Sequence, residues 1–377
     1  MNEISNAVRE AAILIPSLEP DERLPSYIRS LAESGFGNII VVDDGSGEAY
    51  QPVFREVETI DRTVVLHHEV NRGKGVALKT GYRYILDSLP EAKGIITADA
   101  DGQHTVPDCI RLAEKLSEGK RAVYLGSRDF NLPGIPPKSR TGNKITSTVF
   151  KLFYGVWLPD TQTGLRAFRR EDLPFMLEVA GERYEYEMKV LIACATSKIP
   201  LIPVTIETIY ENGKNEGTHF HPIRDSYRIY KVILGSFIRF MGASLVCFGV
   251  DQLLFNVFRG WLFPLLGIQL HLELPLGIRL DNTSLANYTA RFFSAVLNFR
   301  LNKDLVFQVK GGRGTALRYA VTAVCIIILS TLGIKGLGLI GMAPWLAKLI
   351  VDTLLYFLSY RVQRQWVFRE DKPDENP

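Results

Sequence analysis

The hydropathy of the chain changes at about residue 230, and this change constrains the fold more than any other feature. Before it, short apolar runs alternate with charged segments; beyond Phe237 the chain is richly apolar, with charges confined to a few places. A length of 377 residues is enough for two domains. We expect one domain over residues 1–230 and a second over 237–370.

The first 230 residues alternate between strand-like and helix-like segments, which predicts an α/β domain with a mostly parallel sheet. The strand-like runs lie within residues 10–20, 36–48, 63–69, 93–104 and 121–130. Four of them end in residues that could touch a ligand. Because the carboxyl ends of parallel strands share one edge of the sheet, a ligand site is expected at that edge.

The segment "GIITADADGQH", residues 94–104, ends an apolar run with Asp99, Asp101, Gln103 and His104. A solvated turn is the simplest interpretation. A calcium loop fails, because its sixth and twelfth positions would be His104 and Ile110 instead of Gly and Glu. A short metal chelate at the end of a strand remains. The motif alone does not decide between a turn and this site.

The segment "NRGKG", residues 71–75, has the spacing of neither common phosphate-binding loop, because Leu78 stands where GxGxxG requires its last glycine. The glycines could simply begin a helix. Lys74 at a helix N-terminus would also suit a diphosphate.

Composition excludes several other classes of protein. A net charge of +3 without a long basic run argues against nucleic-acid binding. The four cysteines are scattered without CxxC spacing, which fits neither a zinc site nor a disulfide scaffold and indicates a reducing compartment. The apolar run near the N-terminus is too short for a signal peptide, so we expect a cytoplasmic first domain.

The second half contains four segments of nearly bilayer-spanning length, at 237–258, 284–303, 316–334 and 345–364. Arg239, Asp251, Arg291 and Asp352 interrupt three of them, so a soluble helical bundle is the alternative. Residues 319–334, however, carry no charge. Basic residues gather where four spans would place the cytoplasm: Arg300, Lys303, Lys310, Arg313 and Arg318, then Arg361, Arg364 and Arg369.

Six motifs occur in this order along the chain: "ILIPSLEPDE", "VVDDGS", "NRGKGVALKTG", "TADADGQH", "LGSR" and "DTQTGLRAF". Together they resemble family 2 glycosyltransferases of the GT-A fold, in the dolichyl- or polyprenyl-phosphate mannosyl- and glucosyltransferase branch. This resemblance covers roughly residues 10–230. Residues 235–370, with "ARFFSAVLNFRLNKDLVF" and "AKLIVDTLLYFLSYRVQRQWVF", resemble the GtrA-type four-helix membrane domain.

The resemblance assigns roles to individual residues. It implies that Mg²⁺ or Mn²⁺ is bound by Asp99, Asp101 and Gln103. It implies that the donor is bound by these residues and by Pro16, Glu19, Val42, Asp44, Lys74, Ala100 and Arg128. Leu18 stands where the family often has Asn. The acceptor would be bound by Arg140, Gln162, Arg166, His219 and Arg224. The expected catalytic residues are Asp101, Asp160 and Arg128.

Three segments and three charged residues have alternative interpretations. Residues 159–168 and 183–188 could be polar loops followed by amphipathic helices instead of an acceptor site. The helix expected at about 222–236 could lie on a membrane surface or be solvated. The charged residues Asp251, Arg291 and Asp352 within the spans could be functional or structurally paired.

The expected function is metal-dependent, inverting transfer of a hexose from a nucleotide sugar, GDP-mannose or UDP-glucose, to dolichyl or undecaprenyl phosphate at the cytoplasmic membrane face. One alternative is a glycosyltransferase with another acceptor. The other is a flippase or carrier of lipid-linked sugar with a nucleotide-sensing domain. Expected partners are the donor, the lipid phosphate and the membrane; self-association through the membrane helices would give a homo-oligomer.

Overall fold

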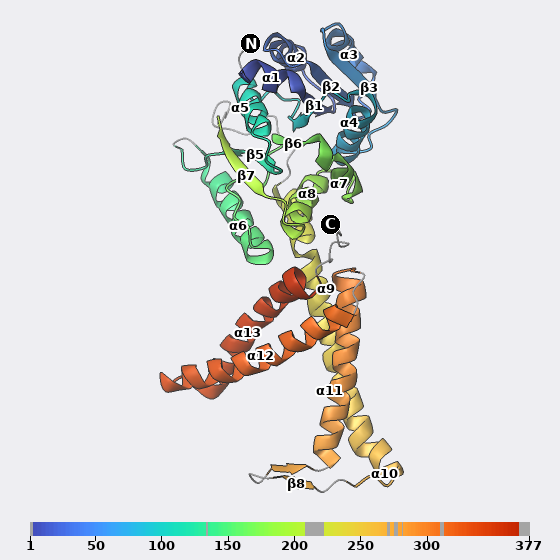
Figure 1. The fold of residues 1–377 in the computed structure, drawn as a ribbon, viewed down its shortest axis with the longest axis vertical. Coiled ribbons are helices and arrows are strands. Elements are labelled where there is room, and N and C mark those ends of the chain that lie inside the picture. The colour runs from blue at the N-terminus through green and yellow to red at the C-terminus, as the bar shows by residue number, and fades with distance from the viewer. Residues whose placement is uncertain are drawn as a thin grey trace, which may run out of the picture. The chain divides into compact units, whose positions relative to one another are not determined.

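A computed structural model describes residues 3–132, 135–207, 222–269, 272–274, 278–280, 282–309 and 313–368 (Figure 1). The chain divides into two compact units, Met1–Ile233 and Leu234–Pro377.

The first unit alternates strands and helices along the chain. Its strands are β1 (Ala11–Ser17), β2 (Asn38–Asp43), β3 (Thr63–His67), β4 (Gly94–Thr97), β5 (Val123–Arg128), β6 (Arg166–Arg169) and β7 (Leu201–Ile206). Its helices are α1 (Glu3–Glu10), α2 (Arg23–Glu33), α3 (Gln51–Glu58), α4 (Lys74–Ser88), α5 (Val106–Ser117), α6 (Pro137–Tyr154), α7 (Leu173–Glu178) and α8 (Glu185–Thr196).

The seven strands form one sheet in the order β3-β2-β1-β4-β6-β5-β7. β6 is antiparallel to both of its neighbours, and the other four pairings are parallel. The prediction of an α/β domain with a mostly parallel sheet, followed by a helical region, is confirmed. The carboxyl ends of β1, β2, β4, β5 and β7 therefore point to the same edge of the sheet.

Helices cover both faces of the sheet, which explains why β1, β2 and β4 read as nearly continuous apolar runs. On one face, inward side chains such as Ile13, Val41 and Ile96 join a buried cluster with residues of α1, α2, α3 and α5. On the other face α4 packs so closely that a side chain on Gly81 would overlap Leu14. Burial of each large aliphatic side chain stabilises the fold by roughly 1.5–3 kcal/mol.

The second unit is mainly helical. Its elements are the greater part of α9 (Pro222–Val257), α10 (Phe263–Leu265), the hairpin β8 (Leu272–Leu274) and β9 (Ile278–Leu280), α11 (Asn282–Leu301), α12 (Arg313–Leu339) and α13 (Pro344–Val362). Helix α9 runs without a break through the junction expected at residues 236–237, where the sequence has no proline to end a helix.

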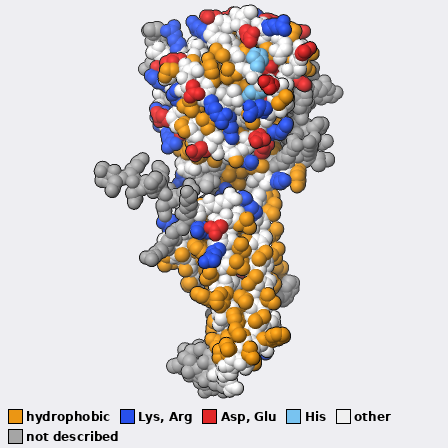
Figure 2. All heavy atoms as spheres, turned by 90° about the vertical axis from the view of Figure 1, so that its right-hand side faces the viewer, with side chains coloured by type: hydrophobic (Ala, Val, Ile, Leu, Met, Phe, Trp, Pro, Cys, Tyr) orange, Lys and Arg blue, Asp and Glu red, His pale blue; other side chains and the backbone are white. Residues whose placement is uncertain are grey.

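The surface of the second unit is unusually apolar for a protein in water. Many large side chains are exposed, including Leu245, Phe248, Leu253 and Ile327, and Figure 2 shows hydrophobic side chains along its helices. Among the described residues, Ile229–Leu265 and Gly314–Leu339 are long and apolar enough to cross a membrane. Helices α11 and α13 overlap two other expected spans. They carry charged side chains and are less apolar than those two segments.

Polar groups within the second unit pair with one another. Buried Asp251 on α9 accepts a hydrogen bond from Ser294 on α11, at 3.0 Å, and its other oxygen lies 3.7 Å from Arg291. Asp352 on α13 accepts a bond from Ser330 on α12 at 2.6 Å. Because an unpaired charge in hydrocarbon is costly, these contacts support a structural role for the three charged residues.

Candidate active site

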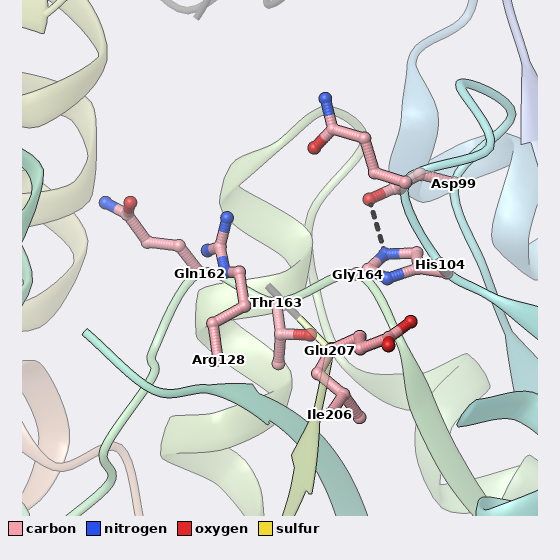
Figure 3. Close-up of a pocket in the computed structure, with 9 residues that line it drawn as sticks. Asp99, His104, Arg128, Gln162, Thr163, Gly164, Ile206 and Glu207 are labelled. Carbon is pink, nitrogen blue, oxygen red and sulfur yellow. Dashed lines mark hydrogen bonds and ion pairs between the residues drawn. The ribbon is translucent and has the colours of Figure 1, made fainter. Parts of the chain in front are cut away.

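A pocket opens where β4, β5 and β7 end, beside the loop that precedes β6 (Figure 3). It brings together residues that are distant in the sequence. Its lining comprises Asp99, Gln103, His104, Arg128, Gln162, Thr163, Gly164, Ile206 and Glu207. Four of the predicted site residues, Asp99, Gln103, Arg128 and Gln162, thus share one cavity.

Asp99 lies at the centre of a charged network. Its Oδ1 accepts a hydrogen bond from Lys74 Nζ at 2.7 Å, and its Oδ2 lies 3.1 Å from His104 Nε2. Lys74 Nζ also lies 2.9 Å from Glu187 Oε2 on α8. Burial raises the pKa of Asp99, but the Lys74 ammonium and the His104 hydrogen bond outweigh it and hold that pKa well below its usual value.

The ammonium of Lys74 responds in the opposite sense. Burial lowers its pKa, but the carboxylates of Asp99 and Glu187 dominate and raise that pKa above its ordinary value. Lys74 is therefore a fixed positive charge at the first residue of α4. Such a charge at a helix N-terminus suits a phosphate.

Asp101 differs from Asp99 in its electrostatic environment. Burial and the nearby negative charge of Asp99 raise the pKa of Asp101. Within the described chain its carboxylate accepts one hydrogen bond, at 3.0 Å from the backbone N–H of Gln103. Two carboxylates and an amide oxygen within one turn are a donor set that suits a hard divalent cation. Such a cation would remove the repulsion that raises the pKa of Asp101. Among the described residues, however, no group of three or more acidic, histidine or cysteine side chains is arranged to hold a metal ion.

Across the pocket, Arg128 and Asp160 form an ion pair. Arg128 Nε donates to Asp160 Oδ2 at 2.7 Å and Nη2 donates to Oδ1 at 3.3 Å. Asp160 is fully buried, and its Oδ1 also accepts the backbone N–H of Gln162 at 3.0 Å. The pair joins the end of β5 to the loop before β6 and fixes where the guanidinium lies.

The predicted donor residues near β1 and β2 lie at the same edge of the sheet. Val42 is buried in β2, Pro16 is partly buried in β1, and Glu19 is exposed. Asp44 is only 3% exposed, and its carboxylate accepts hydrogen bonds from His68 Nδ1 and from the backbone N–H groups of residues 72 and 73. Asp44 thus anchors the loop that leads into Lys74. Ala100 lies between the two carboxylates and is partly buried.

The predicted acceptor residues are less closely grouped. Arg140, on α6, donates to the carbonyl oxygens of Phe130 and Leu132 and does not line the pocket. Arg166 is buried in β6 and donates to the carbonyl oxygens of Thr163 and Glu187. These bonds make Arg166 a brace between the loop and α8. His219 and the side chain of Arg224 lie outside the described residues.

The structure adds Glu187, Gly164, Thr163 and Glu207 to the site. A side chain on Gly164 would place its Cβ 2.3 Å from Asp99 Oδ2, so only glycine allows this loop to approach the carboxylate. Gly164 and Glu187 lie within the segments 159–168 and 183–188, which the sequence analysis had marked as candidates for the site. Their contacts with Asp99 and Lys74 depend on tertiary structure that no local pattern encodes.

Comparisons with known proteins show the family to which the chain belongs. A model described as "Glycosyl transferase family 2" matches residues 12–174, and one described as "GtrA/DPMS, transmembrane domain" matches residues 276–368. The uncharacterized protein MJ1222 of Methanocaldococcus jannaschii is 32% identical over 224 residues, which are 58% of this chain and 89% of that protein. The chain belongs to glycosyl transferase family 2.

Two relatives of this family 2 glycosyltransferase carry functional names. The UDP-N-acetylglucosamine–dolichyl-phosphate N-acetylglucosaminyltransferase of Methanococcus voltae is 28% identical over 225 residues, 55% of this chain and 89% of that protein. The polyprenol monophosphomannose synthase of Mycolicibacterium smegmatis is 28% identical over 169 residues, 43% of this chain and 62% of that protein. The predicted family, the membrane domain fused to it and the glycosyltransferase class of enzyme are confirmed.

Proposed function

We propose that this glycosyltransferase transfers a hexose from a nucleotide sugar to a polyprenyl phosphate, such as dolichyl or undecaprenyl phosphate, at the cytoplasmic face of a membrane. The observation that carries the proposal is the contact of Lys74 with Asp99, opposite Arg128, at the carboxyl end of β4. The names of the two relatives, which act on dolichyl phosphate or make a polyprenol monophosphomannose, support the acceptor. The apolar second unit supports a lipid substrate.

The donor's diphosphate would lie against Asp99, Asp101 and Gln103. These residues would hold Mg²⁺ or Mn²⁺, which supplies positive charge that stabilises the departing nucleoside diphosphate. Lys74 adds a permanent positive charge at the N-terminus of α4. Asp44 contributes by fixing the loop that presents Lys74.

The acceptor phosphate would approach the side of the pocket formed by Arg128. A phosphate monoester has a second pKa of about 6, so at neutral pH it is largely dianionic and attacks without a general base. Arg128 suits its orientation, since a guanidinium matches phosphate oxygens. Burial of Asp160 against Arg128 supports a positioning role for that carboxylate. Attack from the side opposite the leaving group would invert the anomeric configuration.

Turnover of the donor tests this proposal. The purified full-length protein in detergent would be mixed with UDP- or GDP-sugars, with and without undecaprenyl phosphate, and release of UDP or GDP would be measured. The proposal predicts release that depends on the lipid phosphate. Equal release with and without lipid would contradict it, and release triggered by a soluble alcohol acceptor would identify a different acceptor class.

A further inference from the structure

The last residue before the undescribed segment 208–221 is Glu207, which follows β7 and lines the pocket. Figure 3 shows its carboxylate near His104, on the side away from Gln162. No motif of the sequence drew attention to Glu207. Its place beside Asp99 and Arg128 nevertheless puts a second acidic residue in the lining of the pocket.

The backbone of Glu207 is held firmly by α5. Its N–H lies 3.2 Å from Asp108 Oδ2, and Asp108 is only 1% exposed. Arg111, one turn along α5, bridges Asp108 to the carbonyl oxygen of Thr205 with bonds of 2.7 and 2.8 Å. Thr105 caps the same helix through the N–H of Asp108. Because α5 follows directly on the Asp99–His104 turn, one rigid frame positions that turn and Glu207.

The carboxylate of Glu207 has no hydrogen-bond or ion-pair partner within the ranges that the structure describes, and its side chain is exposed to the pocket. In the same wall, Nδ1 of His104 is buried and is likewise without a partner among the described residues. A carboxylate oxygen accepts hydrogen bonds, so Glu207 gives this side of the pocket an acceptor.

A group that complements such a wall must bring hydrogen-bond donors and little negative charge. A diphosphate or a phosphate monoester is disfavoured next to Glu207 where no cation lies between them, because a carboxylate repels it. Sugar hydroxyls and an acetamido N–H meet the requirement, and they are the parts of a nucleotide sugar that lie beyond its diphosphate. This argument rests on the proposed function of the pocket.

We infer that Glu207 is a specificity-determining residue that accepts hydrogen bonds from the hydroxyl or acetamido groups of the sugar being transferred. Its carboxylate binds the sugar, whereas Lys74 and the Asp99–Gln103 turn bind the diphosphate. Helix α5 fixes the distance between these two parts of the site through Asp108 and Arg111.

Binding experiments separate these contributions. Calorimetry on the full-length protein in detergent would compare UDP-glucose, UDP-N-acetylglucosamine and GDP-mannose with UDP and GDP alone, for wild type and Glu207→Gln. Loss of a hydrogen bond to a charged group would raise the Kd of the preferred nucleotide sugar about 10- to 100-fold, and leave the Kd of the free nucleotide unchanged. The control Glu33→Gln removes an equal charge from exposed α2 and should change neither value.

Deoxy analogues of the preferred donor give a second readout. Removal of the hydroxyl that Glu207 binds should weaken wild-type binding by a similar factor, and should have little further effect in Glu207→Gln. Equal weakening in both proteins for every analogue, or an unchanged Kd in Glu207→Gln, would overturn the inference. A parallel rise in the Kd of free UDP or GDP would also overturn it, because Glu207 would then act on the diphosphate. Since binding is measured without acceptor, absence of transfer to lipid would refute the proposed function alone.

Discussion

At the scale of single residues, the site combines features that the sequence could and could not predict. The carboxylates of Asp99 and Asp101 end a buried strand, a motif that alone also fitted a turn. The ligand site was expected because four strands end in residues that could touch a ligand. The pairing of Arg128 with Asp160 joins residues 32 positions apart, and neither local pattern indicates the other. The family resemblance placed Arg166 with the acceptor; in the structure its Nε and Nη1 donate to backbone carbonyls, and its role toward an acceptor stays a prediction.

Substitution of Asp101 by Asn tests the metal role. The change keeps the shape but removes a charge from a site of hard oxygen ligands, so we expect transfer to fall by at least about 100-fold with the fold retained. Wild-type activity should be lost in EDTA and restored by Mg²⁺ or Mn²⁺. Asp87→Asn, on the exposed face of α4, is the matched control. Undiminished activity of wild type in EDTA would refute metal dependence.

Gly164→Ala tests the close approach of the loop to Asp99. The added Cβ would lie 2.3 Å from Asp99 Oδ2, so the carboxylate must move. We expect transfer to fall about 10- to 100-fold, since displacements of about 1 Å in a site cost rates of this order. Gly142→Ala in α6 meets no atom within 4 Å and should retain activity. Similar kinetics for both variants would show that the position of Asp99 is not critical.

At the scale of secondary structure, long apolar runs were predictable and short or interrupted strands were not. Strands β1 to β5 coincide with the runs identified in the sequence. β6 has four residues within a segment that reads as polar, and its antiparallel pairing depends on its neighbours β4 and β5. β7 contains Pro203, which is tolerated because β7 lies at the edge of the sheet.

The opposite edge strand, β3, carries a pH-dependent contact. His67 lies 3.0 Å from Asp43 on β2 and 3.2 Å from Glu58 on α3. Burial lowers the pKa of His67, but its bonds to Asp43 and Glu58 prevail and raise that pKa. Because the pKa of His67 is higher in the folded protein, its protonation stabilises the fold at pH values below its pKa in the unfolded chain, about 6.5. This stabilisation is lost as pH rises through the pKa of His67 in the folded protein.

Thermal unfolding of wild type and His67→Gln from pH 5.5 to 8.5 measures this contribution. Because His67 is 39% exposed, solvent screening limits the pair to roughly 0.5 kcal/mol, or about 1–2 °C in Tm. The Tm of wild type should exceed that of His67→Gln by this amount near pH 5.5, and the difference should shrink by pH 8.5. A difference that grows with pH would contradict the assigned sign.

At the scale of the whole molecule, the change of hydropathy near residue 230 predicted the order of an α/β part and an apolar helical part. Composition shows which helices are apolar enough to cross a membrane, but it does not show how many of them cross it. Charged residues lower the mean hydropathy of a helix even where they are paired, as Asp251 on α9 is with Arg291 on α11. The four-span arrangement and its orientation remain predictions from the basic residues.

Cysteine labelling tests that topology. In a Cys325→Ser background, which removes the exposed native thiol, an impermeant reagent added to intact cells should label Ala343→Cys, in the turn between α12 and α13. It should not label Leu305→Cys, in the helical turn after α11, or Glu33→Cys on the transferase domain. Labelling of Leu305→Cys from outside, with Ala343→Cys protected, would contradict the four-span model.

Identification of the lipid product tests the central claim most directly. The purified protein would be incubated with its preferred nucleotide sugar and either undecaprenyl phosphate or undecaprenol, and the lipids analysed by mass spectrometry and anomeric NMR. The proposed function predicts a sugar phosphate lipid, β-linked when the donor is α-linked, formed from undecaprenyl phosphate alone. A glycosylated undecaprenol formed at a comparable rate, or free sugar as the sole product, would contradict it.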